Sequence, residues 1–179
     1  MKQVVFDHGG SIDKFIGDAV MAFWNAPLAD PDHALHSVRA ACAMQQAMPD
    51  LNRTLVADGL PALGMRIGVH TGQVLVGNMG SRIGRLSYTA LGDAVNLASR
   101  LEGANKAYGT GILLSGATAG RLAGHVPLRV MDLVRVKGKH VAIEVFTPCA
   151  QRTGGARLSA GRLGRGAAAV AGHPAQPLP

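Results

Sequence analysis

Short apolar runs separated by glycine-containing turns occupy most of this 179-residue chain. Near the N-terminus, the runs Ser11–Ile16 and Ala19–Trp24 flank Gly17-Asp18. A two-residue connection of this type predicts a β-hairpin with glycine at the first turn position. A second hairpin is predicted from the runs 65–69 and 73–76, with Thr71-Gly72 as its turn. Further strands are predicted over 86–91, 112–114, 126–136 and 141–146.

Apolar residues at helical spacing predict a long helix after Asp30-Pro31, with Asp30 as N-cap and Pro31 at the first helical position. The pattern ends at Asp58-Gly59, and Pro49 is expected to kink or interrupt it. Other helices are predicted over 4–8, 94–108 and 117–122. Because strands and helices alternate and hairpins occur among them, the fold class is expected to be an α+β or α/β sandwich, with helices packed on a mixed, mostly antiparallel sheet.

Composition places the chain among globular proteins with one sizeable core, since 47% of its residues are hydrophobic and only 4% are aromatic. No apolar run approaches the roughly 18 residues typical of a membrane span, and no signal-peptide core occurs. Two distant cysteines, Cys42 and Cys149, favour reduced thiols in a cytosolic protein. We therefore expect a cytoplasmic location without a membrane segment in this chain.

The net charge of +7 is concentrated in the C-terminal part of the chain. Residues 151–179 contain no acidic residue and are rich in Gly, Ala and Pro, and their four arginines are Arg152, Arg157, Arg162 and Arg165. This composition predicts a disordered tail over 150–179 after a domain over 1–149. The arginines could bind an anionic partner such as nucleic acid, but a solvated tail without a nucleic-acid partner is the favoured interpretation.

The first hairpin carries a candidate binding site. A carboxylate at a tight turn, here Asp18, can bind a hard cation through its oxygens, and Mg²⁺ combines one or two carboxylates with substrate phosphates. Lys14 lies within an apolar strand and needs an acceptor, such as a purine ring or a carboxylate. The alternative is a surface hairpin whose charges are solvated.

Two further segments carry polar side chains suited to a nucleotide. Asn96 and Arg100 are four residues apart on the predicted helix and share a face, where an amide suits a ribose and a guanidinium suits a phosphate. Lys137 and Lys139 lie in a cationic loop that could hold a triphosphate. The alternatives are an ordinary polar helix face and a common surface turn.

Four stretches in one register, spanning about residues 4–147, resemble the class III adenylate/guanylate cyclase catalytic domain: HGGSIDKFIGDAVMAFWNAPLADPDHA, MRIGVHTGQVLVGNMGS, YTALGDAVNLASRLEGANKAYG and VRVKGKHVAIEVF. The resemblance implies the ferredoxin-like nucleotide cyclase fold. It also implies a phosphoryl-transfer reaction in which the ribose 3′-hydroxyl of ATP attacks the α-phosphate, yielding 3′,5′-cyclic AMP and pyrophosphate.

The resemblance also implies roles for individual residues. Asp18 matches a metal-binding aspartate, Lys14 and Thr89 match the pair that reads adenine, and Asn96, Arg100 and Lys137 match the ribose-orienting, transition-state and terminal-phosphate residues. Guanylate cyclases of the family usually have Glu and Cys where this chain has Lys14 and Thr89, so the substrate implied is ATP. Two Mg²⁺ or Mn²⁺ ions and a head-to-tail homodimer with sites at its interface are implied as well.

One part of the family pattern is missing before HGG. The family domain starts with a strand carrying the first metal aspartate, in a motif resembling FADIRGFT, followed by a helix, and Asp7 does not replace that aspartate. We therefore expect an N-terminally truncated domain that lacks the first strand and helix. The alternative function is a catalytically dead fragment or a regulatory dimerisation module. An anion-binding module acting through the arginine tail is a weaker hypothesis.

Overall fold

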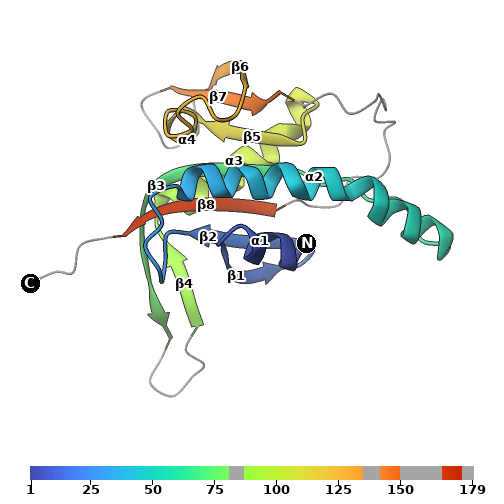
Figure 1. Ribbon diagram of the computed structural model, residues 1–179, viewed down its shortest axis with the longest axis horizontal. Coiled ribbons are helices and arrows are strands. Elements are labelled where there is room, and N and C mark those ends of the chain that lie inside the picture. The colour runs from blue at the N-terminus through green and yellow to red at the C-terminus, as the bar shows by residue number, and fades with distance from the viewer. Residues whose placement is uncertain (81–86, 135–141, 150–166, 175–179) are drawn as a thin grey trace, which may run out of the picture.

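The computed structural model describes residues 1–80, 87–134, 142–149 and 167–174 (Figure 1). Four helices and eight strands follow one another along these residues. In chain order they are α1 (Lys2–Asp7), β1 (Ser11–Ile16), β2 (Ala19–Trp24), α2 (His33–Ala57), β3 (Ile67–Met79), β4 (Ser87–Leu91), α3 (Asp93–Tyr108), β5 (Ile112–Ser115), α4 (Gly116–Ala119), β6 (Leu128–Val134), β7 (Ile143–Pro148) and β8 (Ala167–Pro174).

The strands form one mixed sheet in the order β1-β2-β8-β3-β5-β7-β6, and β4 pairs with β3 beside this path. Four pairs are antiparallel (β1 with β2, β3 with β4, β5 with β7, and β6 with β7). The pairs of β3 with β5 and of β8 with β2 and β3 are parallel. The predicted α+β class, a mixed and mostly antiparallel sheet with helices, is therefore confirmed.

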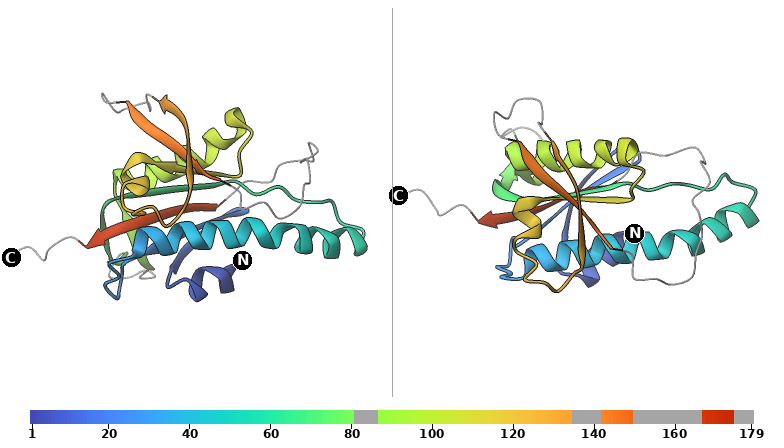
Figure 2. Two further views of the ribbon diagram at one scale, coloured as in Figure 1. Left: turned by 45° about the horizontal axis from the view of Figure 1, so that its top comes forward. Right: turned by 90° about the horizontal axis from the view of Figure 1, so that it is seen from above.

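Helices cover both faces of the sheet, with α2 and α3 on opposite sides (Figure 2). Successive strand residues point to opposite faces, and β2 follows this rule. Ala22 and Trp24 pack with α2 in one core cluster, whereas Met21 and Phe23 pack with residues of β4 and α3 in another. The alternation in β2 therefore separates two apolar cores.

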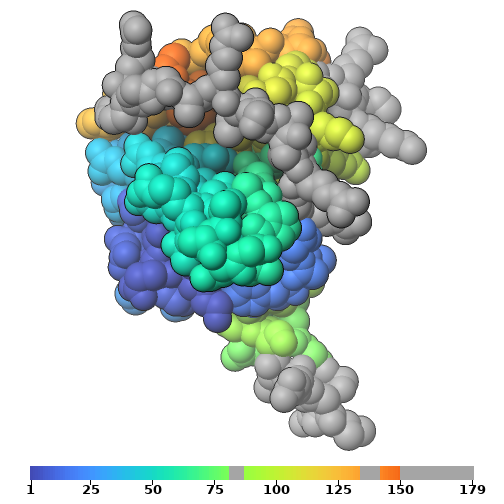
Figure 3. Space-filling model, turned by 90° about the vertical axis from the view of Figure 1, so that its right-hand side faces the viewer, coloured from blue at the N-terminus to red at the C-terminus, as the bar shows by residue number. Residues whose placement is uncertain are grey.

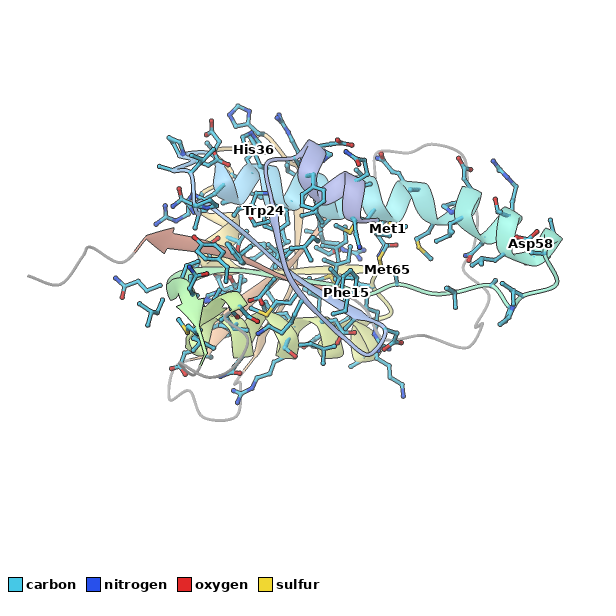
Figure 4. All side chains as sticks on the ribbon, turned by 90° about the horizontal axis from the view of Figure 1, so that it is seen from below. Met1, Phe15, Trp24, His36, Asp58 and Met65 are labelled. Atoms are coloured by element: carbon cyan, nitrogen blue, oxygen red, sulfur yellow. The ribbon has the colours of Figure 1, made fainter. Side chains whose placement is uncertain are left out.

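The start of the chain is fixed by the indole of Trp24, which is fully buried in the interior (Figure 4). Its Nε1 donates a hydrogen bond of 2.8 Å to the carbonyl of His8, just after α1. A side chain at Gly10 could not fit, because a Cβ there would lie 2.6 Å from the indole. The helix predicted over 4–8 is thus found as α1, which packs against the first hairpin.

Most predicted elements occur where the pattern placed them, including the strands 11–16 and 19–24 and the helix over 94–108. The second predicted hairpin was wrong, since residues 67–79 form the single strand β3 and continue through Thr71-Gly72. Glycine at this point serves close packing instead of a turn: a Cβ at Gly72 would lie 2.9 Å from the Cβ of Ala94 on α3.

The predicted start of the long helix was also wrong by about two residues, because α2 begins at His33 with Asp32 as N-cap. Asp30 instead organises the preceding turn. Its carboxylate accepts from the backbone N–H of Asp32 at 2.9 Å and contacts Nδ1 of His36 at 2.7 Å. Pro49 lies inside α2, which is not interrupted there.

The C-terminal region differs from the expected solvated tail at one segment. Ala167–Pro174 forms β8, which inserts between β2 and β3 and pairs with both in parallel. The run Ala167–Ala171 is apolar and made of small residues, apart from one valine, so a strand can form there where two neighbouring backbones supply partners. The rest of the predicted tail lies outside the described residues.

Candidate functional site

The β1–β2 hairpin presents Lys14 in its first strand and Asp18 in its turn. Gly17 has φ of +64°, a conformation that glycine adopts without strain, which confirms the predicted hairpin turn. Asp18 follows it at an exposed position. The turn therefore holds this residue at the exposed tip of the hairpin.

Thr89 lies in β4, opposite Gly77 of β3, and is 5% exposed. Although 75 residues separate them in sequence, Nζ of Lys14 donates a hydrogen bond of 2.8 Å to Oγ1 of Thr89. Lys14 keeps 43% of its side chain exposed, so the ammonium group is partly accessible. The structure thus joins the two residues for which the sequence predicted a shared task.

A third side chain completes this contact. Asp13 is 1% exposed at its side chain, and its Oδ2 accepts hydrogen bonds from Oγ1 of Thr89 at 2.7 Å and from the backbone N–H of Ala90 at 3.0 Å. Its Oδ1 lies 3.2 Å from Nζ of Lys14 in an ion pair, although the angle there is not that of a hydrogen bond. Sequence analysis did not assign Asp13; the adjacent Asp-Lys pair in an apolar strand was the available signal.

The helix α3 carries Asn96 and Arg100 on its exposed face. The opposite face packs on the sheet through the buried residues Ala94, Leu97, Ala98 and Leu101, which follow one another at helical spacing. Close approach to β3 fixes the helix: a Cβ at Gly68 would overlap the carbonyl oxygen of Ala98. Arg66 on the loop before β3 adds a largely buried ion pair to Glu102, with Nε and Oε1 2.9 Å apart.

The described part of the chain contains no group of three or more His, Cys, Asp or Glu side chains arranged to hold a metal ion. Asp18 is by itself suited to supply one oxygen ligand, which is compatible with a Mg²⁺ ion completed by substrate phosphates. Lys137, predicted to hold the terminal phosphates, lies outside the described residues.

Beyond this site, β4 and the end of β3 form an arm that extends from the body of the molecule (Figure 3). Leu75 and Leu91 face each other across the two strands of the arm and are exposed, as are Phe15 and Ile16 on the β1–β2 hairpin. The hairpin and the arm therefore each present exposed apolar side chains.

The sheet, its two helical layers and the position of these side chains define an α+β domain of the nucleotide cyclase type. Residues 4–147 match the model of the adenylate and guanylate cyclase catalytic domain. The chain therefore belongs to the adenylate and guanylate cyclase catalytic domain family.

Relatives of both purine specificities resemble this chain. Adenylate cyclase 1 of Rhizobium meliloti (strain 1021) is 44% identical over 144 residues, which cover 80% of this chain and 22% of that protein. The crystal structure of the adenylyl cyclase CyaB from P. aeruginosa has a TM-score of 0.75 at 32% identity, over 85% of this chain and 78% of that one. The guanylyl cyclase Cya2 has a TM-score of 0.70 at 35% identity, over 82% and 73%.

The match covers only 22% and 29% of the first two curated relatives, the second being an adenylate cyclase of Anabaena cylindrica. The fold is common to neighbours described as adenylyl and as guanylyl cyclases. Among the described helices, none combines the length and apolarity needed to cross a bilayer.

Proposed function

We propose that this chain is an adenylate cyclase catalytic domain that converts ATP to 3′,5′-cyclic AMP and pyrophosphate. The observation that carries the proposal is the hydrogen bond of 2.8 Å between Lys14 and Thr89. Two residues distant in sequence, both implied by the family motif to read adenine, form one donor–acceptor pair at a partly accessible position.

The remaining residues divide the work of binding and phosphoryl transfer. Asn96 orients the ribose so that the 3′-hydroxyl faces the α-phosphate, a positioning effect. Arg100 donates to the phosphate oxygens as charge develops in the transition state, and Lys137 holds the terminal phosphates. The reaction needs no covalent protein intermediate.

Divalent metal binding is assigned to Asp18, which would supply an oxygen ligand to Mg²⁺ or Mn²⁺. When bound, such ions activate the attacking hydroxyl and neutralise the leaving pyrophosphate. The exposed carboxylate at the hairpin tip supports this assignment.

The site is proposed to form between two copies of the chain arranged head to tail, each supplying the metal ligand of one site and the purine, ribose and transition-state residues of the other. The exposed apolar side chains Phe15 and Ile16 on the hairpin and Leu75 and Leu91 on the arm support an interface that uses these elements. The assembly would operate as a soluble enzyme in the cytoplasm, and the tail arginines have no nucleic-acid role in it.

The test is cyclic AMP production by the purified full chain with ATP and Mn²⁺. Arg100→Ala is expected to lower kcat by about 10²–10³-fold, the usual loss when a transition-state donor is removed. Asp18→Ala is expected to abolish the metal-dependent signal. Arg53→Ala, which removes an arginine from an exposed ion pair on α2, is the matched control and should retain the wild-type rate.

Cyclic AMP production no higher than that of Asp18→Ala would refute catalysis by this chain. If ATP still bound under those conditions, the function would instead be that of a nucleotide-binding or dimerisation module without turnover, the alternative that the sequence left open.

A further inference from the structure

An irregularity in β1 places two neighbouring side chains on one face of the sheet. Ile12 lies opposite Ala22, but Lys14 lies opposite Met21, so β1 advances by two residues while β2 advances by one. Asp13 is the extra residue of a β-bulge, which breaks the alternation of the strand. Residues opposite each other share a face, so Lys14 lies on the side of Met21, and Asp13 joins it there instead of pointing away.

The bulge brings Asp13 into contact with the hydroxyl of Thr89. A carboxylate only accepts hydrogen bonds, and Oδ2 of Asp13 accepts both from Thr89 and from the Ala90 N–H. The proton of Thr89 is therefore committed to Asp13. The hydroxyl oxygen accepts from Lys14 and, with its second lone pair, can only accept from a ligand.

Lys14 has the opposite polarity. Its ammonium group can only donate: one proton is directed to Thr89, and its positive charge is paired with Asp13, whose Oδ1 lies 3.2 Å from Nζ. Any further contact that Lys14 makes with a ligand is a donation. The pair thus offers one donor and one acceptor side by side, in fixed roles.

For a base held so that Lys14 faces position 1 and Thr89 faces position 6, this arrangement matches adenine and not guanine. Adenine presents an acceptor at N1 and a donor at its 6-amino group, whereas guanine presents a donor at N1 and an acceptor at O6. Without Asp13, the hydroxyl of Thr89 could rotate and donate to O6. With Asp13, a guanine would oppose acceptor to acceptor and donor to donor, leaving desolvated polar groups unpaired.

We infer that Asp13 is a specificity-determining positioning residue, which selects 6-amino over 6-oxo purine nucleotides by fixing Thr89 as a hydrogen-bond acceptor. The inference rests on the proposed function, because it assumes that a purine binds at Lys14 and Thr89. It goes beyond that function in assigning the choice of purine to a third, buried side chain that acts through Thr89.

The test compares the equilibrium binding of ATP and GTP to the full chain by calorimetry, without relying on turnover. Wild type is expected to prefer ATP. Asp13→Ala should lower the ATP/GTP affinity ratio by about tenfold, since the freed hydroxyl can donate to O6. Asp13→Asn should keep the ratio within about threefold, because the Ala90 N–H holds the amide oxygen where Oδ2 lay. Asp50→Ala, an exposed carboxylate on α2, is the control.

Asp13→Ser is the second variant should Asp13→Ala fail to fold, because a serine hydroxyl can donate or accept and so no longer dictates the polarity of Thr89. Its ratio should fall as well. An unchanged ratio in the folded Ala or Ser variant, or a ratio that falls equally in Asp13→Asn, would overturn the inference.

Amide hydrogen exchange of Ala90 separates this inference from the proposed function. Protection of this amide through Asp13 needs no nucleotide, so it should drop in Asp13→Ala and persist in Asp13→Asn. If the protection of the Ala90 amide changes as expected but the ATP/GTP affinity ratio does not, Asp13 has only a structural role. The inference then fails, while nucleotide binding stands. If wild type binds neither ATP nor GTP, the proposed function fails and the purine selectivity fails with it.

Discussion

Replacing Asn105 with alanine should weaken the attachment of helix α3 to strand β3. Asn105 is fully buried, and its Nδ2 donates to the carbonyl of Ile67 on β3 at 3.0 Å and to the helix carbonyls of Leu101 and Glu102 at 3.0 and 3.2 Å. Its Oδ1 accepts from the hydroxyl of Thr110 at 2.8 Å. One amide therefore links the helix, the strand and the turn that leaves the helix.

The expected loss in the free energy of unfolding is about 2–4 kcal/mol. The bond to Ile67 and the bond from Thr110 connect different elements, and each contributes about 1 kcal/mol net. Leaving these two groups unpaired and opening a small cavity adds a similar amount. The bonds to Leu101 and Glu102 contribute little to this sum, because carbonyls within a helix also accept from the backbone.

Asn105→Asp should be worse than Asn105→Ala at pH 7, because it would place a buried carboxylate against the carbonyl oxygens that the amide now satisfies. Burial raises the pKa of such a carboxyl above its unfolded value. Its penalty is therefore smallest below the unfolded pKa and grows as the pH rises through the folded pKa. The difference in unfolding free energy between Asn105→Ala and Asn105→Asp should therefore decrease as the pH is lowered from 7 to 4.

Urea unfolding, followed by circular dichroism, gives the free energy of unfolding of wild type, Asn105→Ala and Asn105→Asp. Asn52→Ala is the matched control, since Asn52 makes two amide–backbone bonds to Leu63 in an exposed setting. Water can replace those bonds, so its loss should stay below about 1 kcal/mol. The reasoning would be refuted if Asn105→Ala lost no more stability than Asn52→Ala, or if Asn105→Asp were the more stable variant at pH 7.

Three further outcomes are expected. Deleting residues 150–179 removes β8 and should lower the midpoint of urea unfolding, whereas deleting only 175–179 should leave it unchanged. If the unfolding curves of the two deletion variants coincided, β8 would be excluded from the sheet. Burial raises the pKa of the Cys42 thiol, whereas Cys149 is exposed. The reaction of the two thiols with a thiol reagent at pH 8 should therefore have a fast phase from Cys149, lost in Cys149→Ser, and a slow phase from Cys42. Two equally fast thiols would contradict this. The hydrogen bond from Tyr108 lowers the pKa of the Asp132 carboxyl, so NMR titration of Tyr108→Phe should show a higher pKa for Asp132. The difference in unfolding free energy between this variant and wild type should shrink as the pH falls through the pKa of Asp132 in the native protein. An unchanged pKa would exclude the hydrogen bond.

Local pattern was sufficient for elements whose signals lie within a few residues. The hairpin 11–24 was predicted with its bounds because Gly17-Asp18 provides the turn between two apolar runs. The helix α3 was predicted because its apolar stripe has helical spacing. Asn96 and Arg100 share its exposed face as helix geometry requires, so their placement also followed from sequence.

Predictions failed where tertiary packing decided the structure. Thr71-Gly72 has the composition of a turn, but Gly72 is small because α3 crosses β3 there. Residues 167–171 have a small-residue composition that favours disorder, yet β2 and β3 offer them two backbones to pair with. A window of sequence contains neither the crossing helix nor the flanking strands, so it could not reveal either outcome.

Asp13 is the clearest case of information that only the fold supplies. Regular alternation in β1 would place Asp13 and Lys14 on opposite faces, with only one of them able to reach β4. The bulge removes that restriction, and it is held by partners 76 and 77 residues away, the hydroxyl of Thr89 and the N–H of Ala90. The motif could therefore indicate Lys14 and Thr89, the two residues that the fold brings into contact. The direction in which the Thr89 hydroxyl points depends on a carboxylate that the tertiary structure turns inward, and under the inference above that direction sets which purine Thr89 accepts.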